Sequence, residues 1–270
     1  MVDILNRIVS RKHEEIADAR RRMPLERLRE LAANRRDRRP FYEILSRPGR
    51  HGANIIAEIK RASPSKGPLR IDLDPAVIAR AYAAGGAAAL SVLTDRDFFK
   101  GCPDDLVAAR AAVALPVLRK DFLISDYQLY ESCAMGADAV LLICRILSTG
   151  QLSDLLDLTR SLEMDALVEI HTVEDLAMIQ GIGAYLIGIN NRNLATFDTD
   201  IGTAMTMATG LSSGQVPVAA SGIAGREDVQ ANLDQGIFNF LIGETLVRAE
   251  NPAARLAGML PHPPSLKEHR

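Results

Sequence analysis

From Asn54 onward the chain alternates short apolar runs with helical patterns of about 10 to 15 residues. Most of the runs are almost continuously apolar, which is typical of parallel strands that are buried on both faces. Glycine often stands just before a run, and Ser, Thr or Asp often opens the following helix, as expected for helix ends and helix starts. The eight predicted strands are 54–60, 88–93, 115–119, 138–143, 166–170, 185–189, 216–220 and 237–242.

Eight β-α units in about 200 residues predict an α/β fold, a (β/α)8 TIM barrel. The main alternative is a doubly wound open sheet, which would carry a Gly-rich dinucleotide-binding loop after its first strand. The chain has Ser63-Pro-Ser-Lys-Gly67 at that place, and proline argues against a helix start that cradles phosphate there. The sequence therefore favours the barrel.

The first 50 residues read as a helical extension of the barrel, because they are too few to bury a core of their own. Helix is predicted over 2–32, with a break at Met23-Pro24, and again over 40–46. The predicted domains are therefore 1–50 as the extension, 51–262 as a catalytic barrel and 263–270 as a tail.

Charge is concentrated in this extension, which holds 14 Lys and Arg against 8 Asp and Glu. The two signs are mixed on a helical pattern, which favours a solvated helix face over a nucleic-acid site. A further alternative is that some arginines attract an anionic ligand. We expect the extension to close partly over the barrel mouth.

Several classes of protein are disfavoured by composition. Cys102, Cys133 and Cys144 are odd in number and form no C-x-x-C pair, which fits reduced thiols rather than a disulfide framework or a zinc site. No apolar run approaches the ~18 residues of a membrane span, and the N-terminus lacks an apolar signal core. Trp is absent, so stacking on nucleobases is not indicated. We expect a cytoplasmic protein that uses no metal and binds neither membrane nor nucleic acid.

Two charged residues lie at the end of the first predicted strand. Side chains two apart share a face of a strand, so Glu58 and Lys60 point the same way as Ile56. Burying such charges is costly unless they are paired or used. This strand alone leaves open a structural ion pair and a functional site.

Other strands also end in polar residues, and in a barrel the active site lies at these ends. So many polar groups at one mouth are not needed for folding, and we interpret them as a catalytic mouth. They are Glu58, Lys60, Lys120, Glu169, Asn190, Arg192, the Ser221-Gly222 pair and the Gly243-Glu244 pair.

The last two pairs follow predicted strands 7 and 8, where many barrels bind phosphate. Short glycine-containing turns leave backbone N–H groups free at helix starts, where the helix dipole favours an anion. Ser63 and Ser65 could complete the site, and the side chain of Glu244 is expected to point away. Ordinary tight turns are the alternative.

Seven segments together resemble the indole-3-glycerol phosphate synthase family of tryptophan biosynthesis, and the resemblance covers essentially the whole chain. It implies the substrate 1-(2-carboxyphenylamino)-1-deoxyribulose 5-phosphate. The implied products are indole-3-glycerol phosphate, carbon dioxide and water, with no cofactor. The segments are 56–67, 90–94 with Phe99 and Gly101, 118–122, 167–171, 187–194, 220–223 and 240–243.

The resemblance also implies roles. Lys120 would be the general acid, and we expect neighbouring cations to lower its pKa. Glu169 would be the base, Lys60 would hold the substrate carboxylate, and Asn190 would hold the anthranilate part and the hydroxyls. Glu58 would be a second acid-base group or would orient the lysines.

The remaining implied residues bind the substrate. Arg192 would brace the carboxylates or the substrate, and Leu194 belongs to the same segment. The aromatic ring would lie in a slot of Phe99, Phe122 and Leu141. The phosphate would be held by Ser63, Ser221, Gly222, Gly243 and Glu244.

One position departs from the family pattern, because Ala220 stands where the family commonly has Glu. Three alternatives stay open: a phosphoribosyl isomerase, an aldolase with Lys120 as nucleophile, and a non-catalytic barrel that binds a phosphorylated ligand. We expect a monomer or weak homo-oligomer, with possible docking onto other tryptophan-pathway enzymes.

Overall fold

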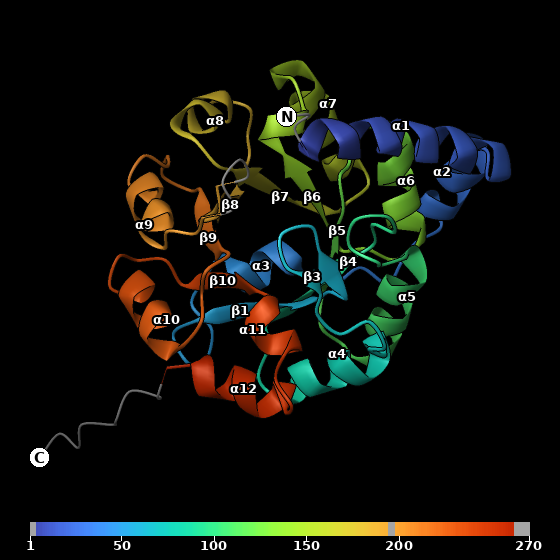
Figure 1. The fold of residues 1–270 in the computed structure, drawn as a ribbon. Helices are drawn as coiled ribbons and strands as arrows, with labels where there is room; N and C mark the ends of the chain where they lie inside the picture. Colours follow the sequence, from blue (N-terminus) through green and yellow to red (C-terminus); the bar gives the residue numbers. More distant parts are fainter. Residues whose placement is uncertain (1–3, 194–197, 262–270) are drawn as a thin grey trace, which may run out of the picture.

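The structure, a computed structural model, describes residues 4–193 and 198–261, and within these ranges eight parallel strands form a closed barrel (Figure 1). The strands follow one another around the barrel in chain order, and β10 closes against β1. This confirms the (β/α)8 barrel over the open sheet. The strands are β1 (Asn54–Ile59), β4 (Ala89–Leu93), β5 (Val117–Lys120), β6 (Ala139–Ile143), β7 (Asp165–Ile170), β8 (Leu186–Asn190), β9 (Val216–Ala220) and β10 (Asn239–Ile242).

Helices surround the barrel (Figure 1). The predicted N-caps are confirmed at Asp74, Ser125, Ser148 and Thr172, whose side chains accept backbone N–H groups of the first turn. A short hairpin of β2 (Ala62–Ser63) and β3 (Gly67–Pro68) follows β1. The helices are α4 (Pro75–Ala84), α5 (Pro103–Ala112), α6 (Asp126–Ala134), η1 (Cys144–Ile146), α7 (Thr149–Ser161), α8 (Val173–Met178), α9 (Gly202–Ala208), α10 (Arg226–Leu233), α11 (Glu244–Val247) and α12 (Pro252–Met259).

The apolar residues divide into two layers, as the alternation along each strand requires. Ile56 belongs to the cluster inside the barrel, whereas Ile55, Ala57 and Ile59 pack between the barrel and its helices. The predicted faces of the first strand are therefore confirmed, and Glu58 lies on the inner face.

Several strand starts were predicted too early. Ile237 is fully buried, but β10 begins only at Asn239. Likewise β5 begins at Val117 rather than 115 and runs on to Lys120. Apolar runs indicate which residues are buried. Buried connecting segments are also apolar, so a run can begin before the residues that form strand hydrogen bonds. The shift makes Lys120 the last residue of its strand.

The N-terminal extension packs against both ends of the barrel. It forms α1 (Ile4–Arg22), α2 (Leu25–Ala33) and α3 (Phe41–Leu45), with the predicted break at Pro24. Leu5 and Ile8 of α1 and Phe41 and Leu45 of α3 all belong to the inner apolar cluster. The backbone of α3 meets the strand starts, because the Asn239 side chain donates to the Leu45 carbonyl. The predicted tail, 263–270, lies outside the described residues.

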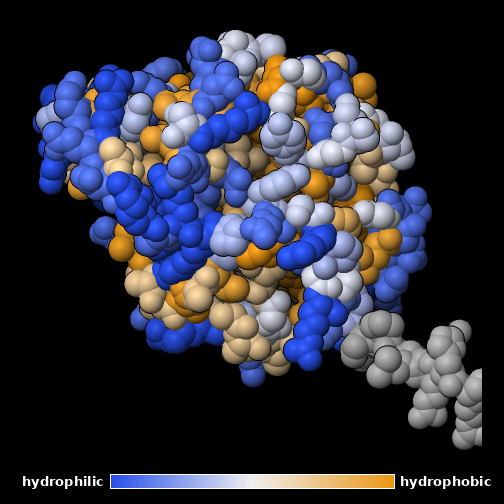
Figure 2. Space-filling view, turned by 180° about the vertical axis from the view of Figure 1, so that it is seen from behind, coloured by the Kyte–Doolittle hydropathy of each residue, from blue (hydrophilic) through white to orange (hydrophobic). Residues whose placement is uncertain are grey.

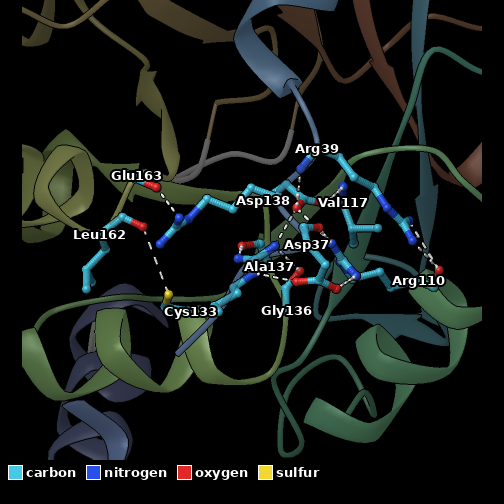
Figure 3. A network of polar contacts seen from close by, with 12 residues as sticks. Asp37, Arg39, Arg110, Val117, Cys133, Gly136, Ala137, Asp138, Leu162 and Glu163 are labelled. Carbon is cyan, nitrogen blue, oxygen red and sulfur yellow. Dashed lines mark hydrogen bonds and ion pairs between the residues drawn. The ribbon is translucent and has the colours of Figure 1, made fainter. Parts of the chain in front are cut away.

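A polar network fastens the α2–α3 connection to the barrel (Figure 3). Asp138, just before β6, accepts the backbone N–H of Val117 at 3.0 Å and that of Arg39 at 3.0 Å. Its Oδ1 also lies 2.5 Å from a guanidinium nitrogen of Arg35 and 3.2 Å from one of Arg110. A fully buried carboxylate so paired fixes the extension to the amino-terminal end of the barrel.

Hydrophilic side chains dominate the side of the molecule that carries the N-terminal helices (Figure 2). Arg20 and Arg21 are largely exposed, in line with the predicted solvated face. The prediction is wrong for Lys12 and Arg35, which are buried in ion pairs. None of the helices in the described ranges is long and apolar enough to cross a membrane.

Candidate active site

A cavity of about 470 Å³ opens at the carboxyl ends of the barrel strands. Its size is that of a site for a small molecule. Every predicted site residue that the structure describes lines this cavity; Leu194 lies outside the described residues. The predicted residues on the wall are Glu58, Lys60, Ser63, Phe99, Lys120, Phe122, Leu141, Glu169, Asn190, Arg192, Ser221, Gly222, Gly243 and Glu244.

The charged centre of the cavity consists of two ion pairs. Lys60 donates to Glu58 Oε1, and Lys120 Nζ lies 3.6 Å from Glu169 Oε2. Asn190 Nδ2 donates to the other oxygen of Glu169 at 3.2 Å. Both carboxylates are about 5% exposed, so the pairs work in a largely dry environment.

The charge state of Lys120 differs from the prediction. Burial alone lowers the pKa of this amine, but the carboxylates of Glu169 and Glu58 outweigh burial and raise it. The expected lowering is therefore wrong, because the groups nearest to Lys120 are anions rather than cations. Lys120 thus holds its proton at neutral pH.

The pKa values of the two carboxylates, Glu169 and Glu58, shift in the opposite direction. Burial raises the pKa of Glu169, but the charge of Lys120 and contacts from His171 and Asn190 lower it to about 2. Burial likewise opposes ionisation of Glu58, yet Lys60 and Lys120 lower its pKa. The site at rest therefore holds protonated amines against ionised carboxylates.

One wall of the cavity is apolar and includes residues that the sequence did not assign to the site. The rings of Phe99 and Phe122 lie 6.0 Å apart at 40°. Across from the barrel strands, α1 adds Ile4, Leu5 and Ile8 to the wall. Their helical spacing predicted a buried face, but not which part of the barrel it would cover.

The opposite end of the cavity carries the loops that follow β9 and β10. Ser221 and Gly222 are both left-handed, with φ of 69° and 79°, which turns the chain sharply after β9. Thr245 Oγ1 donates to the Ile223 carbonyl and joins the two loops. Glu244 lies between Arg192, at 3.9 Å, and Arg248, at 3.4 Å. These contacts partly neutralise the carboxylate that the sequence placed near a phosphate.

Gly243 approaches Glu58 so closely that a side chain at position 243 would require Glu58 to move. A Cβ at position 243 would lie 2.4 Å from Glu58 Oε1 and 3.1 Å from Glu58 Cβ. We expect Gly243→Ala to displace Glu58 and to lower kcat by about 10- to 100-fold. The measurement is steady-state turnover at saturating substrate.

The matched control is Gly225→Ala, because a Cβ at Gly225 would meet no heavy atom within 4 Å and its φ of −156° suits any residue. Equal turnover of the two variants would contradict the role of this close approach.

Lys12 of α1 forms a buried ion cluster beside the apolar wall. Its Nζ lies 2.7 Å from Asp95, 2.9 Å from Asp121 and 2.8 Å from Glu15. Burial lowers the pKa of Lys12, but Asp121 and Asp95 outweigh burial and raise it. Its place seven residues beyond Leu5 and four beyond Ile8 was a readable signal that it belongs to the buried face.

The carboxylates of this cluster also hold the aromatic wall. Asp95 Oδ1 accepts the backbone N–H of Phe99 at 3.1 Å, and Asp121 Oδ1 accepts that of Phe122 at 2.8 Å. Lys12 therefore connects α1 to both phenylalanines and to the residue that follows Lys120.

In residues 4–193 and 198–261, no three His, Cys, Asp or Glu side chains gather in a way that could hold a metal ion.

The closed barrel and the charged cavity at the carboxyl ends of its strands are typical of (β/α)8 enzymes, whose active sites lie at that end. The sequence model of indole-3-glycerol phosphate synthase matches residues 5–259. A protein of that name from Desulfosudis oleivorans is 55% identical over 261 residues, which are 96% of this chain and 99% of the relative. One from Syntrophobacter fumaroxidans is 51% identical over 95% of this chain and 97% of the relative. The chain belongs to the indole-3-glycerol phosphate synthase family.

Solved structures with little sequence similarity share the fold alone. The 3-hexulose-6-phosphate synthase of Salmonella typhimurium has a TM-score of 0.62 at 12% identity, over 76% of this chain and 96% of that one. Thiamine phosphate pyrophosphorylase of Pyrococcus furiosus has a TM-score of 0.58 at 12% identity, over 78% of this chain and 95% of that one.

Proposed function

We propose that the cavity converts 1-(2-carboxyphenylamino)-1-deoxyribulose 5-phosphate to indole-3-glycerol phosphate, carbon dioxide and water. Family membership supports the reaction. The observation that carries the mechanism is the pairing of Lys120 with Glu169 at 3.6 Å, a proton donor beside a proton acceptor.

Ring closure requires a proton on the ketone oxygen as the aromatic carbon attacks it. Lys120 supplies this proton, and its raised pKa keeps it protonated for the step. Lys60 balances the substrate carboxylate until carbon dioxide leaves, while Glu58 orients Lys60 through their hydrogen bond. Loss of carbon dioxide restores the aromatic ring.

Proton donation by Lys120 makes Glu169 a stronger base for the later dehydration. Glu169 is a weak base while Lys120 is charged, because that charge lowers the pKa of the carboxylate. Once Lys120 has given its proton to the substrate, the positive charge at 3.6 Å is gone and Glu169 accepts a proton more readily. Glu169 then removes the proton that dehydration requires and passes it to the leaving hydroxyl, which departs as water, and Lys120 regains its proton from solvent.

The two ends of the cavity suit the two ends of the substrate. The anthranilate ring packs on Phe99, Phe122 and Leu141, under the apolar residues of α1. The phosphate binds at the opposite end, on the backbone N–H groups of the loops after β9 and β10. Asn190 and Arg192 hold the part of the substrate that lies between the ring and the phosphate. Phosphate-end residues are Ser63, Ser221, Gly222, Gly243 and Glu244.

An aldolase mechanism fits this site less well. A Schiff base forms from a neutral amine, but the neighbouring carboxylates raise the pKa of Lys120 and keep it charged. Borohydride with a ketose phosphate is therefore expected to trap no covalent adduct.

The direct test mixes the purified protein with the anilino-deoxyribulose phosphate, without added metal or cofactor, and follows indole fluorescence. The chain has no Trp, so its own background is low. A steady rise is the expected result, whereas no rise from folded protein would remove the proposed reaction and leave the barrel standing.

We also propose a cellular location and an oligomeric state for the enzyme. We place it in the cytoplasm as a monomer or weak homo-oligomer that can dock onto other tryptophan-pathway enzymes. Gel filtration of the purified protein, alone and mixed with such an enzyme, measures both states.

A further inference from the structure

His171 is a buried histidine directly behind the proposed base. It follows β7, and its side chain is only 4% exposed. Glu169 lines the cavity, but His171 is not among the described residues that do so. The imidazole therefore contacts the carboxylate from the side away from the substrate.

The ring lies between two carboxylates. Its Nε2 is 3.3 Å from Glu169 Oε1, and its Nδ1 is 4.0 Å from Asp175 Oδ2. Asp175 is itself held in place, because it accepts the backbone N–H groups of His171 at 2.8 Å and Thr172 at 3.1 Å. Neither ring nitrogen makes a well-aligned hydrogen bond within the described residues. A buried polar ring in this state calls for an explanation.

The explanation lies in Glu169 Oε1, the oxygen that His171 and Asn190 both contact. Glu169 Oε1 receives Asn190 Nδ2 at 3.2 Å and faces the imidazole, while Oε2 faces Lys120. The oxygen that His171 contacts is thus held from two sides, which fixes the orientation of the carboxylate. The contact also makes the basicity of Glu169 depend on whether the imidazole carries a charge.

We propose that His171 is the positioning residue of Glu169: it orients the carboxylate and, through its own protonation, controls how strongly Glu169 accepts a proton. This inference rests on the proposed function, in which Glu169 is the base. A charged imidazole at 3.3 Å stabilises the carboxylate and weakens the base, and a neutral imidazole does not.

Among the residues that the structure describes, two carboxylates lie against the imidazole. Glu169 faces it from β7 and Asp175 from α8, with Lys120 of β5 beyond Glu169. The thiol of Cys144 in η1 lies near both carboxylates; burial, then Asp175 and Glu169, raises its pKa to about 12. The thiol therefore stays neutral between pH 5 and 8.

Two substitutions separate positioning from titration. His171→Ala removes both the contact and the charge, and we expect kcat at pH 8 to fall about tenfold while KM stays within about twofold. His171→Gln keeps an amide donor but cannot be charged. We expect its kcat at pH 8 to lie within about threefold of the parent and the acid limb of its kcat profile to move down by about one pH unit.

The experiment is the pH profile of kcat and KM from pH 5 to 9 for the parent, both variants and His51→Gln, with thermal unfolding as a check of folding. His51 is a half-buried histidine in the loop before β1, so its variant is expected to keep the parent profile. An unchanged acid limb in His171→Gln, or a parental kcat in His171→Ala, would overturn the proposal. A parent without turnover would instead overturn the proposed function on which it rests.

Discussion

Lys120→Ala is expected to lower kcat by about 10³-fold or more while the barrel remains folded. The amine is the only proton donor that the mechanism places at the ketone, and general acid catalysis is typically worth 10² to 10⁴ in rate. Its loss also leaves Glu169 without the ion pair at 3.6 Å. Indole fluorescence under saturating substrate measures the effect, and circular dichroism verifies the fold.

Lys100→Ala is the matched control, because this lysine is exposed and its Nζ donates a hydrogen bond to the Asp97 carbonyl, away from the ion pairs of the cavity. Its turnover should equal that of the parent. If the substitution at Lys120 destabilises the barrel, Lys120→Met keeps the stem and repeats the test. Substantial turnover in a folded Lys120 variant would remove this residue as the acid.

Lys12→Met is expected to lower the free energy of unfolding by about 3–5 kcal/mol, because it leaves two buried carboxylates without their shared cation. We also expect KM to rise about tenfold, which corresponds to about 1.4 kcal/mol of lost substrate binding. The reason is that Asp95 and Asp121 hold the backbone of Phe99 and Phe122, where the ring packs. Urea unfolding and steady-state kinetics measure the two effects.

The comparison variant is Arg27→Met, which breaks the exposed pair with Glu30 in α2 and should cost less than about 1 kcal/mol. Inhibition by ligand fragments separates the two ends of the cavity. In Lys12→Met, anthranilate should bind more weakly and inorganic phosphate should bind as before. If Lys12→Met unfolds like Arg27→Met and keeps the parental KM, the cluster has no positioning role.

The sequence was most informative where one property decides the structure. The apolar runs predicted the strands, and the alternation of these strands with helices predicted the barrel. Strand alternation placed Glu58 on the inner face, and the position of Lys120 and Glu169 at strand ends placed them at one mouth. Such inferences need only the local period and the general rule that barrel sites lie at the carboxyl ends.

The errors arise where distant segments meet. The sign of the pKa shift of Lys120 depends on which charges surround it in space, and the two nearest are carboxylates from other strands. Lys12 was expected in solvent because the partners that bury it lie more than 80 residues away, at Asp95 and Asp121. The predicted strand starts were displaced because hydrophobicity does not distinguish a strand from a buried connecting segment.

One segment, residues 4–45, packs against both ends of the barrel, with α1 at the cavity and α3 at the strand starts. Its ion partners Asp95, Asp121 and Asp138 come later in the chain, so this segment leaves the ribosome before any of them exists. Docking of α1 and α3 must therefore wait for the barrel strands and forms contacts of large sequence separation, which are slow to form. We therefore expect the cavity to be completed late in folding, and until then the apolar faces of both helices are exposed, which favours aggregation.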